Sequence, residues 1–100
     1  MTRAKASSYP ELGRVFAGYL HEDFLAEWGT PEAALRAFLA DASPGERRRF
    51  QREVSRFLTH IATLDFDAAR DLFSELGSRW TPPSHEALVA LLTAARNPSA

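Results

Sequence analysis

The residues best suited to chemistry in this sequence are the consecutive His21, Glu22 and Asp23, because imidazole and carboxylate groups can bind metal ions or transfer protons. A His-x-Asp pair binds one metal ion only if both side chains lie on the same side of the backbone. A strand meets that condition, whereas helical residues two apart point in directions about 200° apart. The other histidines, His60 and His85, are isolated and at no spacing typical of metal ligands. We therefore predict no metal site.

The composition gives no support to other kinds of catalysis. The sequence has no cysteine, which rules out a thiolate nucleophile, a cysteine-bound zinc ion and a disulfide scaffold. Its serines fall in the tails, at predicted helix caps or on predicted exposed helix faces. The sequence contains neither a G-x-S-x-G motif nor a glycine-rich phosphate loop. We expect no cofactor and no enzymatic activity.

Length and charge set the broad class of the protein. A chain of 100 residues is sufficient for one domain with one core, and a net charge of -1 gives no general attraction to nucleic acid. The first residues lack the apolar run of a secretory signal, and no stretch approaches the roughly 20 apolar residues of a membrane span. The expected location is the cytoplasm, with neither a membrane nor a nucleic-acid partner.

Apolar residues recur at helical spacing along most of the chain, and no segment shows a convincing strand-like alternation. Helix starts are marked by Thr30, by the S-x-x-E capping box of Ser43 and Glu46, and by Ser84 after a Pro-Pro link. The predicted helices are one at about 10–21, one at about 31–41, the longest after Ser43, one over LDFDAARDLFSEL before Gly77, and one from Ser84. The sequence thus predicts an all-α fold: a single compact bundle of about five helices with short connections over 10–96, following a disordered tail at 1–9.

Asp23 does not fit the apolar stripe of the first helix. If that helix continued through the stretch GYLHEDFLAEWG, Asp23 would point into the stripe and His21 away from it. Either the helix breaks near His21, with Asp23 capping a short turn over 24–28, or it continues with Asp23 buried and hydrogen-bonded to Tyr19, a tryptophan or an arginine. Both alternatives give Asp23 a structural role. A large aromatic further along, Trp80, is expected to plug the end of the bundle.

Charges are distributed unevenly along the chain. Residues 22–32 include four acidic side chains and no basic one, and residues 65–75 carry four acidic side chains against Arg70 alone. The long third helix is rich in arginine on its outer face, at Arg48, Arg49, Arg52 and Arg56. This face is either a solvated surface in which Glu53 pairs with Arg49 and Arg56, or a surface for a protein or nucleic-acid partner of a helical adaptor or regulator. Aromatic residues are absent from it, which disfavours nucleic acid.

The first third of the chain resembles a known family. Phe16, Tyr19, His21 and Asp23 follow the Phe-x-x-Tyr-x-His-x-Asp-like signature of the immunity proteins of bacterial contact-dependent growth inhibition, and aromatic residues follow at Phe24 and Trp28. The sequence departs from the signature at Leu20, where the family more often has an aromatic residue. The stretches GTPEAALRAFL and LFSELGSRWTPPSHEALVALL are similar to later segments of the same family.

This resemblance implies a bacterial cytoplasmic protein that binds the C-terminal domain of a cognate toxin and neutralises it by stoichiometric occlusion. It also implies that the protein is a monomer when free or a heterodimer with the toxin. Acidic side chains would suit such a role, because many toxins of this kind are nucleases with basic substrate sites. The candidate partner-binding residues are Tyr19, His21, Glu22, Asp23, Glu27, Trp28, Asp67 and Asp71.

Overall fold

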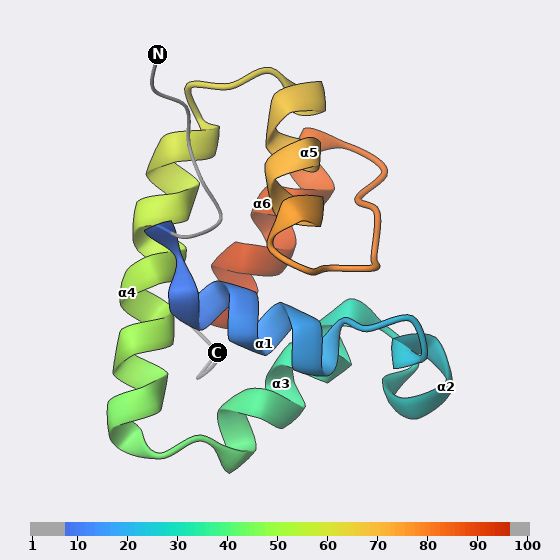
Figure 1. Cartoon of the computed structure of the whole chain (residues 1–100), viewed down its shortest axis with the longest axis vertical. Coiled ribbons are helices and arrows are strands. Elements are labelled where there is room, and N and C mark those ends of the chain that lie inside the picture. The colour runs from blue at the N-terminus through green and yellow to red at the C-terminus, as the bar shows by residue number, and fades with distance from the viewer. Residues whose placement is uncertain (1–7, 97–100) are drawn as a thin grey trace.

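The chain forms six helices in a computed structural model that describes residues 8–96 (Figure 1). The helices are α1 (Pro10–Tyr19), α2 (Phe24–Trp28), α3 (Pro31–Asp41), α4 (Pro44–Ile61), α5 (Phe66–Glu75) and α6 (His85–Arg96). Every regular element of the described residues is helical, so the all-α prediction is confirmed. The helix beyond the five expected is the five-residue α2.

Local sequence signals account for most helix starts. The side chains of Thr30, Ser43 and Ser84 each accept the backbone N–H three residues later, at 3.0, 3.2 and 3.0 Å. Glu46 completes the predicted capping box, since its carboxylate accepts the Ser43 backbone N–H at 2.9 Å. These helix starts were predictable because each cap and its partner lie within one helical turn.

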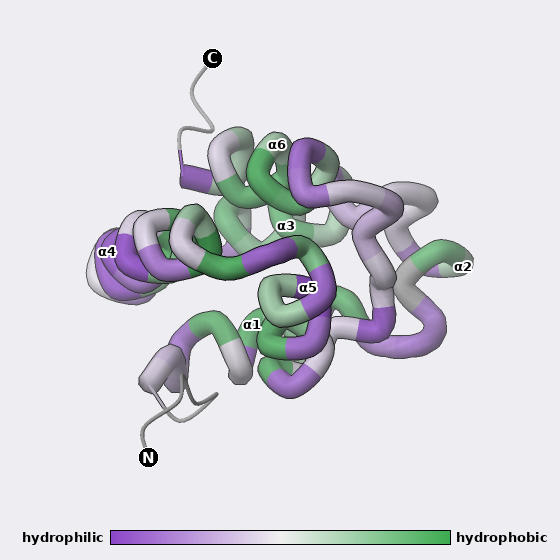
Figure 2. The backbone as a smooth tube through the Cα atoms, turned by 90° about the horizontal axis from the view of Figure 1, so that it is seen from above, coloured by the Kyte–Doolittle hydropathy of each residue, from purple (hydrophilic) through white to green (hydrophobic). Residues whose placement is uncertain are grey.

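The core is formed by apolar faces of all the long helices. Four phenylalanines are completely buried, Phe16 on α1, Phe50 and Phe57 on α4, and Phe73 on α5. Phe16 and Phe73 are in edge-on contact with ring centroids 4.8 Å apart, which joins α1 to α5. Helix α6 contacts α3, α4 and α5. Figure 2 shows that the outer side of α4 is mostly hydrophilic, so α4 is buried on one face only.

Tyr9, predicted to lie in the disordered tail, is instead part of the core. It is only 5% exposed, its ring lies edge-on against Phe57 at 5.2 Å, and its hydroxyl lies 3.3 Å from Nδ1 of His60. Residues 1–7 of the expected tail lie outside the described residues. The correction at Tyr9 has a simple reason: its ring fills space between the start of α1 and the end of α4.

Helix α1 ends two residues earlier than predicted, at Tyr19. Leu20 is fully buried, its N–H donates to the Phe16 carbonyl at 2.8 Å, and its own carbonyl accepts the N–H of Arg79 at 2.7 Å. The α5–α6 connection therefore occupies the end of α1, where the next turn of helix would otherwise lie. That connection contains no strand, and within it Trp80 packs against the core, edge-on to Phe73 at 6.0 Å.

Candidate protein-binding surface at the α1–α2 junction

The break after α1 brings together two aromatic residues of the stretch that resembles the family signature. Tyr19 at the end of α1 stacks on Trp28 at the end of α2, with ring centroids 6.0 Å apart and planes inclined by 26°. The other neighbour of Tyr19 is Phe38 of α3, in edge-on contact at 5.6 Å. Both Tyr19 and Trp28 are partly buried against the core. This stack holds α2 against α1 and α3.

His21 fixes the turn between the two helices. Its Nδ1 accepts the backbone N–H of Asp23 at 3.0 Å, and its Nε2 lies 2.8 Å from the Glu27 carboxylate. A ring nitrogen that accepts a hydrogen bond carries no proton, so this geometry requires the tautomer with its proton on Nε2, which then donates to Glu27. Both ring nitrogens are thus engaged within the turn.

Asp23 has neither of the two structural roles that the sequence suggested. The helix does break before it, and α2 follows it, but the Asp23 side chain makes no capping hydrogen bond and is exposed rather than buried. The backbone conformation of Asp23 explains why its side chain does not cap α2. Asp23 has a ψ of 12°, whereas the working caps Thr30 and Ser43 have extended values of 157° and 160° that turn the side chain back over the helix start. The Asp23 carboxylate is therefore free to meet a partner.

Leu25 was not among the predicted site residues, yet it is 63% exposed. Among the side chains that the structure describes, it is the one large hydrophobic side chain that is mostly exposed. The only signal in the sequence is the position of Leu25 within an acidic run. We use the name α2 edge for Glu22, Asp23, Leu25 and Glu27, all of which are exposed. Figures 1 and 2 both place α2 at the margin of the molecule opposite α4.

The remaining predicted acidic residues, Asp67 and Asp71, belong to a different part of the surface. Both lie on α5, are highly exposed, and pair with Arg70 at 3.3 and 3.6 Å. The chain enters α5 at the end farther from α2 (Figure 1), so the structure does not bring Asp67 to the α2 edge. The charge of Asp67 and Asp71 is also partly balanced by Arg70, whereas the ion pair found at the α2 edge is that of His21 with Glu27.

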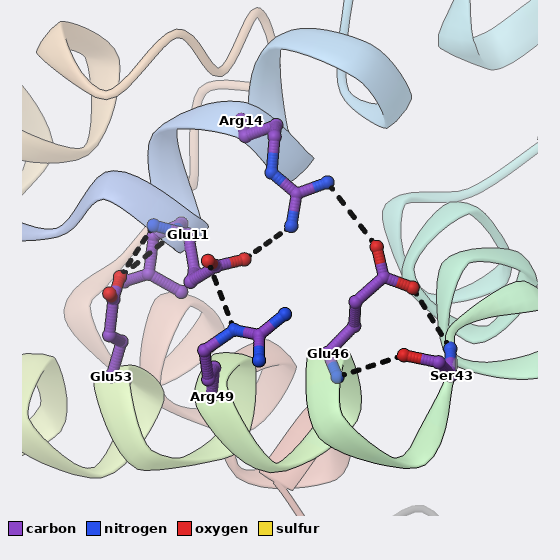
Figure 3. A network of polar contacts seen from close by, with 7 residues as sticks. Glu11, Arg14, Ser43, Glu46, Arg49 and Glu53 are labelled. Atoms are coloured by element: carbon purple, nitrogen blue, oxygen red, sulfur yellow. Dashed lines mark hydrogen bonds and ion pairs between the residues drawn. The ribbon is translucent and has the colours of Figure 1, made fainter.

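The predicted pairing of Glu53 with Arg49 and Arg56 is wrong. Glu53 is buried, with 8% exposure, and one carboxylate oxygen accepts the backbone N–H groups of Glu11 and Leu12 at 2.9 and 3.1 Å (Figure 3). The first turn of α1 has no side-chain cap of its own. Glu53 takes that role from α4, because the N-terminal end of a helix attracts a carboxylate.

The arginine-rich face of α4 is partly occupied by contacts with the start of α1. Arg49 pairs with Glu11 at 3.4 Å (Figure 3), and Arg56 lies 5.1 Å above the Tyr9 ring and donates to the Ser8 carbonyl at 3.2 Å. Within the described part of the chain, Arg48 and Arg52 are the two exposed arginines of this face that form no ion pair, no cation–π contact and no side-chain hydrogen bond. The stripe is therefore shorter than the sequence suggests.

Among residues 8–96, no three histidine or acidic side chains are grouped so as to hold a metal ion. The helices of that span are also too short or too polar to cross a membrane. The fold and surface are those of a small helical protein whose exposed features suit contact with another protein. A family model described as CdiI immunity protein matches residues 8–93, so the chain belongs to the CdiI immunity protein family. No curated protein and no solved structure was found to match it.

Proposed function

We propose that this protein acts in the bacterial cytoplasm as the immunity partner of a toxin, and that it binds the C-terminal domain of that toxin through the α2 edge. Family membership supports the general role. The observation that supports this surface is Leu25, 63% exposed within a run of acidic side chains that contains no lysine or arginine. Binding would cover the substrate site of the toxin, so inhibition would be stoichiometric and would need no chemistry from the immunity protein.

Each part of the α2 edge has a physical role in this proposal. Leu25 would enter an apolar depression on the toxin, where a buried anchor contributes most of the binding energy. The acidic side chains would attract a basic toxin surface and speed association. The stack of Tyr19 on Trp28 would hold α2 in place before binding, which reduces the entropy lost when the complex forms.

The proposal is tested with the toxin domain encoded immediately upstream of this gene. Leu25→Ala should weaken binding by about tenfold or more, mainly through faster dissociation. The double change Glu22→Lys and Asp23→Lys should slow association and reduce its dependence on salt, because it removes the steering charge. Both sets of side chains are exposed, so the free energy of unfolding should change by less than about 0.5 kcal/mol in each variant.

A control reverses two other exposed carboxylates, with Asp67→Lys and Asp71→Lys on α5. We expect this variant to bind the toxin with a smaller change than the α2 variants. Titration of toxin activity should reach full inhibition at equimolar immunity protein; inhibition by a small fraction of that amount would indicate catalysis and contradict occlusion. The surface assignment fails if the α2 variants bind normally while Arg48→Glu with Arg52→Glu abolishes binding.

A further inference from the structure

A hollow of about 340 Å³ lies next to Tyr19, between α1, α3 and the start of α4. This volume is at the low end of the range for ligand pockets, so it suits a single side chain better than a large ligand. The residues that line it are Arg14, Val15, Gly18, Tyr19, Phe38, Asp41, Ala42 and Glu46. We call it the Gly18 groove, because a Cβ attached at Gly18 would meet no atom within 4 Å.

The charges at the mouth of the Gly18 groove favour a cation. Arg14 contacts Glu11 and lies 3.7 Å from Glu46, and Arg49 pairs with Glu11, so these two arginines and two glutamates balance each other (Figure 3). Asp41 stands outside this balanced set. No lysine, arginine or histidine of the described residues forms an ion pair with it. Among the residues that line the groove, Asp41 and Glu46 stand against Arg14 alone, so the lining carries an excess of one negative charge.

The position of Asp41 strengthens this preference. It is the last residue of α3, whose final turn contains no basic residue. The C-terminal end of a helix carries a partial negative charge, which adds to that of the carboxylate and attracts a cation. Arg47 of α4 compensates only in part, by donating to the Leu39 carbonyl at 2.8 Å. The apolar lining of Val15 and Phe38 would cover the hydrocarbon stem of a long basic side chain.

From this arrangement we infer that the Gly18 groove receives one arginine side chain of the toxin. The stem would lie along the apolar wall and the guanidinium would lie between Asp41 and Glu46. Arginine fits better than lysine because its planar, forked group of five donors can serve two carboxylates at once. Glu46 can join, since its separation of 3.7 Å from Arg14 is longer than a direct hydrogen bond. The inference rests on the proposed function, and Tyr19 makes the groove continuous with the α2 junction.

The groove can be tested without the toxin, by NMR titration of the whole protein with Nα-acetyl-arginine methylamide. Chemical shifts should change at the amides of Gly18, Tyr19 and Ala42, with a dissociation constant in the millimolar range expected for so small a ligand. The citrulline analogue has the same shape without the charge and should cause much smaller changes. Equal changes with both compounds, or changes located elsewhere, would overturn the inference.

Two variants separate the groove from the rest of the surface. Asp41→Asn should weaken binding of the arginine compound about two- to fivefold. Gly18→Leu should fill the groove and abolish that binding, while Gly18→Ala is the matched control that leaves it open. With the toxin, Gly18→Leu should reduce affinity about tenfold relative to Gly18→Ala.

The two proposals fail in different ways. Unchanged toxin affinity in Gly18→Leu would refute the groove and leave the proposed function standing. If the wild-type protein does not bind the toxin at all, the proposed function fails and the arginine titration still decides whether the groove binds a basic side chain. Thermal melts of the variants should show an intact fold, since Gly18 is exposed and a Cβ at this position meets no atom within 4 Å.

Discussion

Replacing Glu53 tests the contact that joins the start of α1 to α4. Pro10 occupies the first position of α1 and has no N–H, so Glu11 and Leu12 supply the first backbone donors of the helix. Both donate to one buried oxygen of Glu53, and Leu12 itself is fully buried. Glu53→Ala would leave the Leu12 N–H without a partner and without access to water.

The expected cost follows from the two hydrogen bonds. Bonds to a charged acceptor contribute about 1.5–3 kcal/mol each, and a buried donor left unsatisfied costs about 1–3 kcal/mol. Part of this is offset because the buried charge no longer has to be desolvated. We expect Glu53→Ala to lower the free energy of unfolding by about 2–4 kcal/mol in total. Glu53→Gln keeps an acceptor oxygen and loses only the charge, so it should cost about 1 kcal/mol.

Denaturant unfolding followed by circular dichroism measures these differences. The matched control is Arg52→Ala, an exposed neighbour on the same helix, which should change stability by less than about 0.5 kcal/mol. Hydrogen exchange gives a local readout, because the amides of Glu11 and Leu12 should lose protection in Glu53→Ala beyond the global change. A loss of less than about 1 kcal/mol with unchanged protection at Leu12 would refute the capping role.

Two further predictions concern helix ends. The backbone N–H and the side chain of Ser43 form hydrogen bonds that lower the pKa of Glu46. The Glu46 carboxylate therefore stabilises the fold fully at pH values above the ordinary glutamate pKa, and this stabilisation is lost as the pH falls through the lowered pKa of Glu46. The stability difference between wild type and Glu46→Gln should accordingly disappear in acid unfolding titrations, and a pH-independent difference would contradict this. Gly77 has a φ of 109° and would place an added Cβ 3.3 Å from that of Ala17, so Gly77→Ala should destabilise by about 1–3 kcal/mol in denaturant unfolding. Gly29→Ala is the control. Gly29 also has a positive φ, of 84°, but an added Cβ there meets no atom within 4 Å, so this variant measures the cost of the backbone conformation alone. An equal loss of stability in both variants would argue against close packing at Gly77.

Local signals in the sequence were enough to predict the all-α fold and most helix boundaries. The caps at Thr30, Ser43 and Ser84 use partners three residues away, so their geometry depends on only a few neighbouring backbone angles. Gly77 likewise follows the end of α5, where it has the positive φ that favours glycine after a helix. The signature residues Tyr19, His21 and Trp28 were identified as a group, and the structure brings them to one junction.

Only the tertiary structure decided where α1 ends and how it begins. The carbonyl of Leu20, the residue that follows α1, accepts the N–H of Arg79. The first backbone donors of α1, at Glu11 and Leu12, bond to Glu53, which lies 42 and 41 residues further along the chain. Helical periodicity describes neighbours within a few residues and carries no information on such distant partners. For the same reason Glu53 was read as one half of a surface ion pair, and the exposure of Leu25 was not foreseen. Which side chains remain uncovered depends on how the helices pack, and that packing leaves α2 at the margin of the molecule (Figure 1).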